Sequence, residues 1–177
     1  GPGAEPGRGI DVSKPVVSIV MGSDSDLETM KESAAILAKF AVPCELRVFS
    51  AHRSPNLLAR YVRAAERGGV MVFIAGAGAA AALPGSVAAL TTRPVLGVPL
   101  PSSHLQGLDA LLAIAQMPAG TPAAALAIGV AGAKNAALLA IQILALSNRP
   151  LAGKLSAFKA AQEREIGKKD ARVRRLG

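Results

Sequence analysis

Two short segments hold most of the side chains that could do chemistry. The first, "GSDSD" (22–26), offers Ser23, Ser25 and Asp26 directly after a run rich in β-branched residues. Backbone N–H groups and hydroxyls at a strand-to-helix turn can hold an anion such as phosphate, and a carboxylate can accept hydrogen bonds from sugar hydroxyls. Helix capping by Ser or Asp is the alternative, and it needs no ligand.

The second segment, "SAHRSP" (50–55), places His52 next to Arg53. Histidine exchanges a proton near neutral pH, and arginine can clamp a phosphate with two parallel hydrogen bonds. The pair suggests acid–base chemistry on a phosphorylated substrate, with a structural loop histidine as the alternative. The other histidine, His104, lies in a proline-flanked loop. Two histidines so far apart, without nearby carboxylates, argue against a zinc site.

A third segment, "IAGAGAAAALPGS" (74–86), is almost entirely small and has no ionisable group. Such a loop-like stretch is either filler between better-formed elements or a surface whose backbone and small size are the functional features. The sequence around it has to decide between the two interpretations.

Hydrophobic periodicity predicts the elements that position these segments. Short β-rich runs occur at 16–21, 43–49, 70–75, 93–99 and 123–129. Helical patterns alternate with them at 27–40, 56–67, 107–116, 133–146 and 151–169. The alternation predicts an α/β fold with a parallel sheet of about five strands and right-handed crossovers. Ligands bind beyond the carboxyl ends of such strands, which is where all three segments fall.

Composition narrows the class of protein. The chain has 177 residues, 51% hydrophobic and 18% charged, which argues for a globular domain and against disorder. We expect residues 1–14 to be a disordered leader or an expression remnant, and residues 15–177 to form a single domain with a C-terminal helix. No apolar run is long enough for a membrane span. Cys44 is the one cysteine, so the default location is the reducing cytoplasm.

The net charge of +8 is concentrated at the C-terminal end. Residues 151–177 hold eight Lys and Arg against three Asp and Glu. With one Tyr, four Phe and no Trp, the chain lacks the aromatic side chains that stack on bases. We therefore interpret the basic tail as a solvated helix end, and expect neither a nucleic-acid nor a membrane partner.

Six motifs, taken in order, resemble the bacterial-type N5-carboxyaminoimidazole ribonucleotide mutases of purine biosynthesis, in the phosphoribosylaminoimidazole carboxylase catalytic subunit family. They are "MGSDSD", "SAHRSP", "AGAGAAAALPG", "GVP", "GLDALLAIAQMPAGTP" and "GAKNAALLAIQIL". The resemblance covers about residues 15–147. "SAHR" before a Gly-Ala segment looks like the mutase class rather than the animal-type carboxylase class, which carries Lys after its His.

The resemblance implies a flavodoxin-like three-layer sandwich, a homo-octamer, and a reaction on a small ribonucleotide without metal or organic cofactor. A carboxylate moves from N5 to C4 of the ring through enclosed aminoimidazole and carbon dioxide, with His52 as proton shuttle. Ser23 and Arg53 would hold the 5′-phosphate and Asp26 the ribose hydroxyls, while Ser25 would lie near the base. The further implied substrate contacts are Ser50, Ala51, Ala77, Gly78 and Leu83.

The chain departs from the family pattern within the site. The third segment usually reads Gly-Ala-Gly-Gly-Ala-Ala-His-Leu-Pro-Gly-Met, and this chain has Ala79, Ala82 and Ser86 at the fourth, seventh and eleventh places. Leu27 replaces a Trp, and Ala110 replaces a Ser. Two alternatives to a working mutase stay open. One is direct carboxylation of aminoimidazole ribonucleotide by carbon dioxide, and the other is a ribonucleotide-binding scaffold with impaired catalysis.

Overall fold

A computed structural model describes residues 10–11 and 13–176 of the chain. They fall into two compact units, which divide between Ile141 and Gln142. The leader expected at 1–14 lies mostly outside the described residues. The single domain expected over 15–177 stays a prediction.

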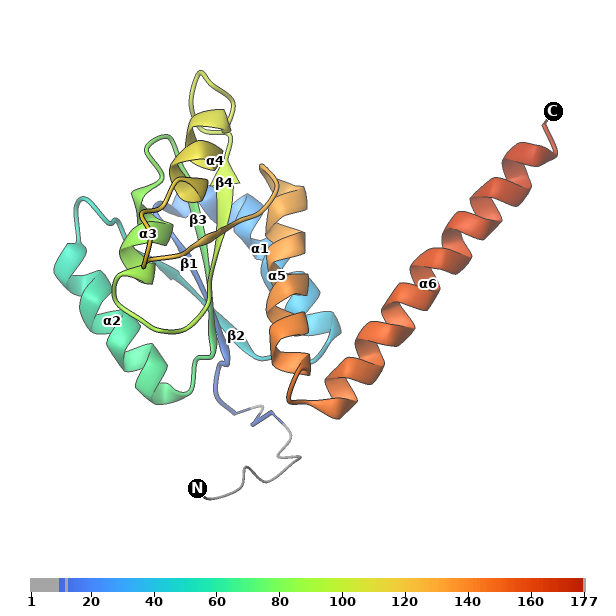
Figure 1. Cartoon of the computed structure of the whole chain (residues 1–177), viewed down its shortest axis with the longest axis horizontal. Helices are drawn as coiled ribbons and strands as arrows, with labels where there is room; N and C mark the ends of the chain where they lie inside the picture. Colours follow the sequence, from blue (N-terminus) through green and yellow to red (C-terminus); the bar gives the residue numbers. More distant parts are fainter. Residues whose placement is uncertain (1–9, 12, 177) are drawn as a thin grey trace. The chain divides into compact units, whose positions relative to one another are not determined.

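The first unit is built on a parallel five-stranded sheet in the order β2-β1-β3-β4-β5 (Figure 1). Its strands are β1 (Val17–Met21), β2 (Cys44–Val48), β3 (Val72–Gly78), β4 (Val95–Leu100) and β5 (Ala124–Ala125). The parallel sheet and the α/β class confirm the sequence prediction. The fifth strand is much shorter than the predicted run 123–129, which agrees with the low strand propensity of alanine.

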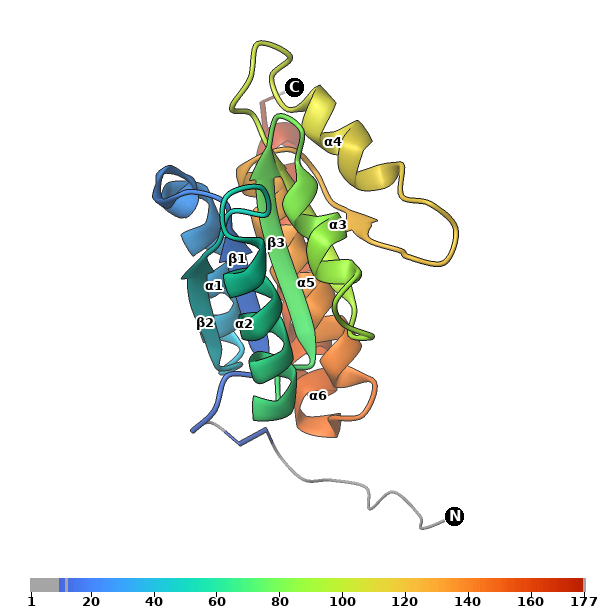
Figure 2. The same cartoon turned by 90° about the vertical axis from the view of Figure 1, so that its left-hand side faces the viewer.

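Helices cover both faces of this sheet, which gives three layers (Figure 2). Those of the first unit are α1 (Leu27–Lys39), α2 (Pro55–Gly68), α3 (Ala82–Ala88), α4 (Leu108–Ala115) and most of α5 (Val130–Ala145), with a short 3-10 helix η1 (Asp24–Asp26). α2 and α3 lie on one face, and α1 and α5 lie on the other (Figure 1).

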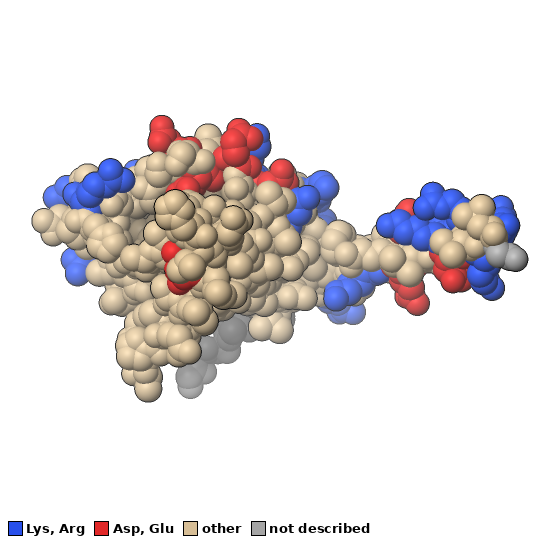
Figure 3. All heavy atoms as spheres, turned by 90° about the horizontal axis from the view of Figure 1, so that it is seen from above, with Lys and Arg blue, Asp and Glu red and all other residues tan. Residues whose placement is uncertain are grey.

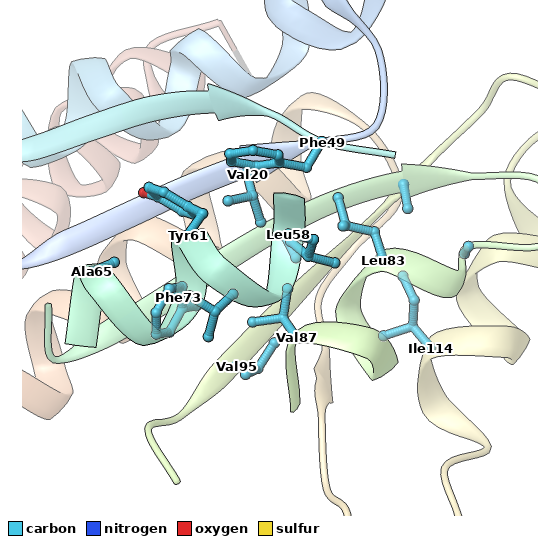
Figure 4. Close-up of a cluster of buried hydrophobic side chains, with 14 of the residues drawn as sticks. Val20, Phe49, Leu58, Tyr61, Ala65, Phe73, Leu83, Val87, Val95 and Ile114 are labelled. Atoms are coloured by element: carbon cyan, nitrogen blue, oxygen red, sulfur yellow. The ribbon is translucent and has the colours of Figure 1, made fainter. Parts of the chain in front are cut away.

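The core on the α2 and α3 face is a cluster of buried aliphatic and aromatic side chains (Figure 4). Val20 and Phe73 come from the central strands, and Leu58, Val87 and Ile114 come from the helices that cover them. Alternate residues of a strand point to opposite faces, and β1 and β3 are buried on both sides. Burial on both faces holds the strand ends, and hence the loops that follow them, in fixed positions.

The second unit contains α6 (Arg149–Arg174), which extends beyond the predicted 151–169. The Leu151 N–H donates to Asn148 Oδ1 at 3.0 Å, and Pro150 occupies the first turn, so the helix start is well capped. Figure 3 shows the Lys and Arg side chains along this helix in blue. Among the described residues, no helix is both long and apolar enough to span a bilayer.

Candidate active site

A cavity of about 310 Å³ lies where the loops after β1, β2 and β3 meet. Every residue that the sequence singled out for the site lines it, except Arg53. These lining residues are Ser23, Ser25, Asp26, Ser50, Ala51, His52, Ala77, Gly78 and Leu83. The carboxyl edge of the sheet therefore brings three segments that are distant in sequence into one place, as the parallel topology requires. Their chemical roles stay predictions.

The first wall of the cavity is the turn between β1 and α1. Ser23 has an extended backbone and caps η1, because its Oγ accepts a hydrogen bond from the Ser25 N–H at 3.3 Å. The Ser25 hydroxyl also donates to Ser23 Oγ, at 3.0 Å. Capping and ligand binding are thus not exclusive, since both hydroxyls cap or brace the turn and still line the cavity.

Asp26, at the end of this turn, places a half-buried carboxylate in the cavity wall. Loss of water around the carboxylate raises the pKa of Asp26 above its usual value, and the nearby Asp24 adds to the rise. Backbone hydrogen bonds at Ser23 and Gly22 oppose it. A ligand with hydroxyl groups would provide donors that replace the lost water, which suits a sugar.

The second wall is the loop between β2 and α2, and serines hold it closed. The Ser50 N–H donates to Ser54 Oγ at 3.0 Å, and the Ser54 hydroxyl donates back to the Ser50 carbonyl at 2.9 Å. His52 is exposed on this loop and lines the cavity. Its imidazole therefore reaches both the cavity and solvent.

Arg53 is the predicted site residue that the structure leaves outside the cavity wall. Its backbone N–H and its Nε both donate to Ser50 Oγ, at 3.0 and 3.3 Å. Because the Arg53 side chain is exposed, it can rotate and bring its other guanidinium N–H donors to a ligand.

The third wall is the Gly-Ala segment, and here the sequence prediction was wrong in part. β3 continues to Gly78 instead of ending at 75, and the loop-like stretch contains helix α3. Pairing of Gly78 with Leu100 of β4 explains the longer strand. Pro84 and Gly85 have low helix propensity, but a proline in the first turn is tolerated because the N–H groups there have no helical partner.

Two alanines of this wall have unusual backbone conformations. Ala79 has φ 50° and Ala81 has φ 44°, in the left-handed region that favours glycine. The chain thus turns from β3 into α3 through residues that pay a steric cost of about 1–2 kcal/mol each relative to glycine. The neighbours Ala80 and Ala82 complete the wall without adding a polar side chain.

Ser102 is a lining residue that the sequence analysis missed. It follows β4, and its hydroxyl lies against Gly78, where a Cβ would collide with it. The rule that pointed to the loops after the first three strands also applies to β4, so the proline-rich segment with Ser102 could have been found. Gly22, Ala80 and Ala81 also line the cavity without having been assigned a role.

The cavity combines one proton-transfer group, several hydroxyls, one carboxylate and an apolar wall of small side chains. Across the described part of the chain, no three His, Cys, Asp or Glu residues lie close enough to form a metal site. Such a set of groups can hydrogen-bond to hydroxyls and to an anion, and a histidine can exchange a proton near neutral pH.

Comparisons with known proteins point in one direction. The sequence model of a family described as AIR carboxylase matches residues 16–165. The N5-carboxyaminoimidazole ribonucleotide mutase of Saccharolobus solfataricus is 51% identical over 152 residues, covering 86% of this chain and 95% of that relative. The mutase of Vibrio cholerae is 52% identical over 150 residues, covering 85% and 93%. The crystal structure of Treponema denticola PurE matches with TM-score 0.82 at 28% identity, over 90% of this chain and 98% of that one.

Proposed function

The chain belongs to the AIR carboxylase family, and on that premise we propose that it is a mutase of purine biosynthesis. It converts N5-carboxyaminoimidazole ribonucleotide to 4-carboxy-5-aminoimidazole ribonucleotide. The main support for the proposal is that His52 lines the same cavity as Ser23, Ser25 and Asp26 on one side and the alanines 79–82 on another. The mutase names of relatives about half identical to this chain support it.

The turn after β1 binds the ribose phosphate end of the substrate in this account. The hydroxyls of Ser23 and Ser25 donate to the 5′-phosphate and the edge of the base, and Asp26 accepts from the ribose hydroxyls. Arg53 turns from Ser50 to pair with the phosphate, so its guanidinium exchanges a neutral hydroxyl acceptor for an anionic one. Backbone of Ser50, Ala51, Ala77 and Gly78, with the side chain of Leu83, surrounds the ring.

His52 carries the proton that the isomerisation moves. Protonated His52 donates to the exocyclic nitrogen while the bond from that nitrogen to the carboxyl carbon breaks and carbon dioxide leaves. The electron-rich C4 then attacks carbon dioxide, and neutral His52 accepts the proton that C4 loses. The proton returns to its starting group, so the reaction consumes none and needs no outside acid.

The alanine wall retains carbon dioxide between the two steps. Ala77 is buried, and the side chains from Ala79 to Ala82, beside Gly78, are all methyl groups. A small apolar wall neither fills the space next to the ring nor brings in water, so the released gas stays near C4. Larger side chains in the same places would fill the space next to the ring, and charged side chains would bring in water.

We infer that copies of the chain associate in a homo-oligomer in the cytoplasm, with the family octamer as the expected form. Large apolar side chains are exposed around α4 and the start of α5, at Leu105, Leu108, Leu112, Ile128 and Val130. An exposed apolar cluster of this kind favours association with another protein surface. Sedimentation velocity on the purified chain measures the assembly, and a monomer would contradict it.

A carboxyl-labelling experiment tests the activity against the two alternatives. The purified protein receives N5-carboxyaminoimidazole ribonucleotide labelled with ¹³C in the carboxylate, in buffer with unlabelled bicarbonate, and product is followed by NMR. A mutase gives C4 product that retains the label. Product formed only from aminoimidazole ribonucleotide and bicarbonate would establish direct carboxylation instead. Binding of the ribonucleotide without product would establish the scaffold.

A further inference from the structure

Tyr61 lies outside the cavity, yet it contacts the residue from which the His52 loop departs. Its ring, on α2, stacks on Phe49 with centroids 4.7 Å apart and 28° between the planes (Figure 4). The Arg47 guanidinium lies over both rings, 4.4 Å from the centroid of Tyr61 and 5.3 Å from that of Phe49. Phe49 is the residue between the end of β2 and Ser50.

The hydroxyl of Tyr61 joins α2 to two strands. It donates to Glu45 Oε1 on β2 at 2.7 Å, and lies 2.6 Å from the hydroxyl of Ser18 on β1. Because the single phenol proton goes to Glu45, the Ser18 hydroxyl is the donor in the second bond. Ser18 is fully buried, so its loss of a partner would leave an unsatisfied polar group.

The geometry of the His52 loop depends on the two elements that flank it. The loop leaves the sheet at Phe49, whose N–H donates to the Met21 carbonyl at 2.9 Å, and it ends where α2 begins at Pro55. Its own hydrogen bonds join Ser50 to Ser54 and Arg53 and do not tie it to the sheet. A shift of α2 against β2 would therefore move the imidazole of His52.

We propose that Tyr61 is a positioning residue that sets the location of His52 by clamping α2 to Phe49 and to the first two strands. The inference rests on the proposed function, because it gives His52 the proton-transfer role. Tyr61 acts through Phe49 and the start of α2, and it does not touch the substrate.

The hydroxyl bonds of Tyr61 and its stack on Phe49 act together in this positioning. A second cavity, of about 360 Å³, borders Tyr61, Glu45 and Arg47. A ring with open space beside it is not held by neighbours on that side, so the hydroxyl bonds and the stacking on Phe49 fix it. Burial raises the pKa of the Tyr61 phenol, which keeps its proton available for Glu45 at the pH of the cell.

The test compares Tyr61→Phe, which keeps the ring and removes both hydrogen bonds, with Tyr61→Leu, which also removes the stack. Ser33→Ala is the matched control. The Ser33 hydroxyl is fully buried and donates to the Ala133 carbonyl at 2.6 Å, between α1 and α5 on the other face of the sheet. The control thus loses a comparable buried hydrogen bond without a direct contact to Phe49 or the His52 loop.

Proton NMR of the free protein distinguishes positioning of His52 from a general contribution of Tyr61 to stability. A general contribution would not shift the His52 signals selectively. The chain has two histidines, so the imidazole signals of His52 can be followed with His104 as an internal reference. We expect the His52 signals to shift and broaden in both Tyr61 variants and to stay in place in Ser33→Ala, while His104 is unchanged in all three. Equal shifts of both histidines, or none, would overturn the proposal.

Kinetics supply the second readout. Because a displacement of 1 Å can cost a large factor in rate, we expect kcat to fall about threefold to tenfold in Tyr61→Phe and about tenfold to hundredfold in Tyr61→Leu. We expect Ser33→Ala to stay within about twofold, since it does not touch the loop. Tyr61→Phe decides the matter if Tyr61→Leu does not fold, and unchanged kcat in a folded Tyr61→Phe would contradict the proposal. A wild type without mutase turnover would refute the proposed function, while the NMR comparison would still decide the role of Tyr61.

Discussion

The Ser102 hydroxyl occupies the space directly over the α-carbon of Gly78. A Cβ on residue 78 would collide with Ser102 and come within 3.2 Å of the Leu100 carbonyl oxygen. We therefore predict that Gly78→Ala lowers the free energy of unfolding by about 1–3 kcal/mol, as overpacking does. It also lowers kcat/KM, because Gly78 lines the cavity. Urea unfolding and steady-state kinetics measure the two effects.

Ser102→Gly provides the matched test of this relationship. In the Gly78→Ala background it removes the clashing hydroxyl, so part of the lost stability returns, although the Leu100 carbonyl stays close. The double-mutant cycle measures the coupling directly. Additive costs of the two substitutions would show that Ser102 does not restrict residue 78.

Ala79 is predicted to be a site of backbone strain. Its φ of 50° lies in the region where glycine avoids the steric cost of a Cβ. Ala79→Gly removes that cost, partly offset by the greater freedom of glycine in the unfolded chain, so the free energy of unfolding rises by up to about 1 kcal/mol. Ala80→Gly, next along the same wall and without a positive φ, should instead lower it by about 0.5–1 kcal/mol. Thermal and urea unfolding distinguish the two, and equal losses would contradict the strain.

Asp26 predicts a pH dependence of stability. Because its pKa is raised in the folded protein, the folded state holds this proton to higher pH than the unfolded chain does. Stability therefore falls as pH rises through the interval between the two pKa values, and the penalty is complete above it. Asp26→Asn removes this charge, so the variant gains stability relative to wild type as the pH rises from the acid range to neutral. Urea unfolding at several pH values measures it, and a constant difference would contradict the argument.

Arg53 should act on substrate affinity more than on the chemical step. It stands outside the cavity wall, and its Nε donates to Ser50 Oγ. Arg53→Lys keeps the charge and loses the two-pronged contact with phosphate, so we expect KM to rise about tenfold with kcat within about threefold. The control is Arg60→Lys, an exposed arginine on α2, which should leave both constants unchanged. A fall in kcat alone would place Arg53 in the chemistry instead.

The sequence located most of the cavity because the carboxyl ends of parallel strands meet at one edge. From strand order and loop composition, this rule predicts that Asp26 and His52 lie close together. Both line the same cavity in the structure. Ser102 was missed because the sequence analysis considered only the loops after the first three strands, although His104 in the same segment had been noted. Helix α3 was not predicted from the sequence, because Pro84 and Gly85 lower helix propensity. Packing against β3 and β4 outweighs that local preference.

Tertiary contacts between distant positions left no local signal. The Ser18 and Tyr61 hydroxyls are 43 positions apart in sequence, and neither pattern around them indicates the other. The left-handed conformation of Ala79 was likewise beyond prediction from this chain alone, although the family resemblance pointed to a glycine there.

The central claim is that His52 transfers the proton, and the direct measurement is turnover by His52→Asn with ribonucleotide binding measured in parallel. Asparagine approximates the shape and keeps hydrogen-bonding groups but cannot exchange a proton near neutral pH. We predict that kcat falls about 100-fold or more, while the dissociation constant of the ribonucleotide changes only a few fold. His104→Asn, on the loop after β4, is the control and should keep full turnover. Undiminished turnover in His52→Asn would contradict the account.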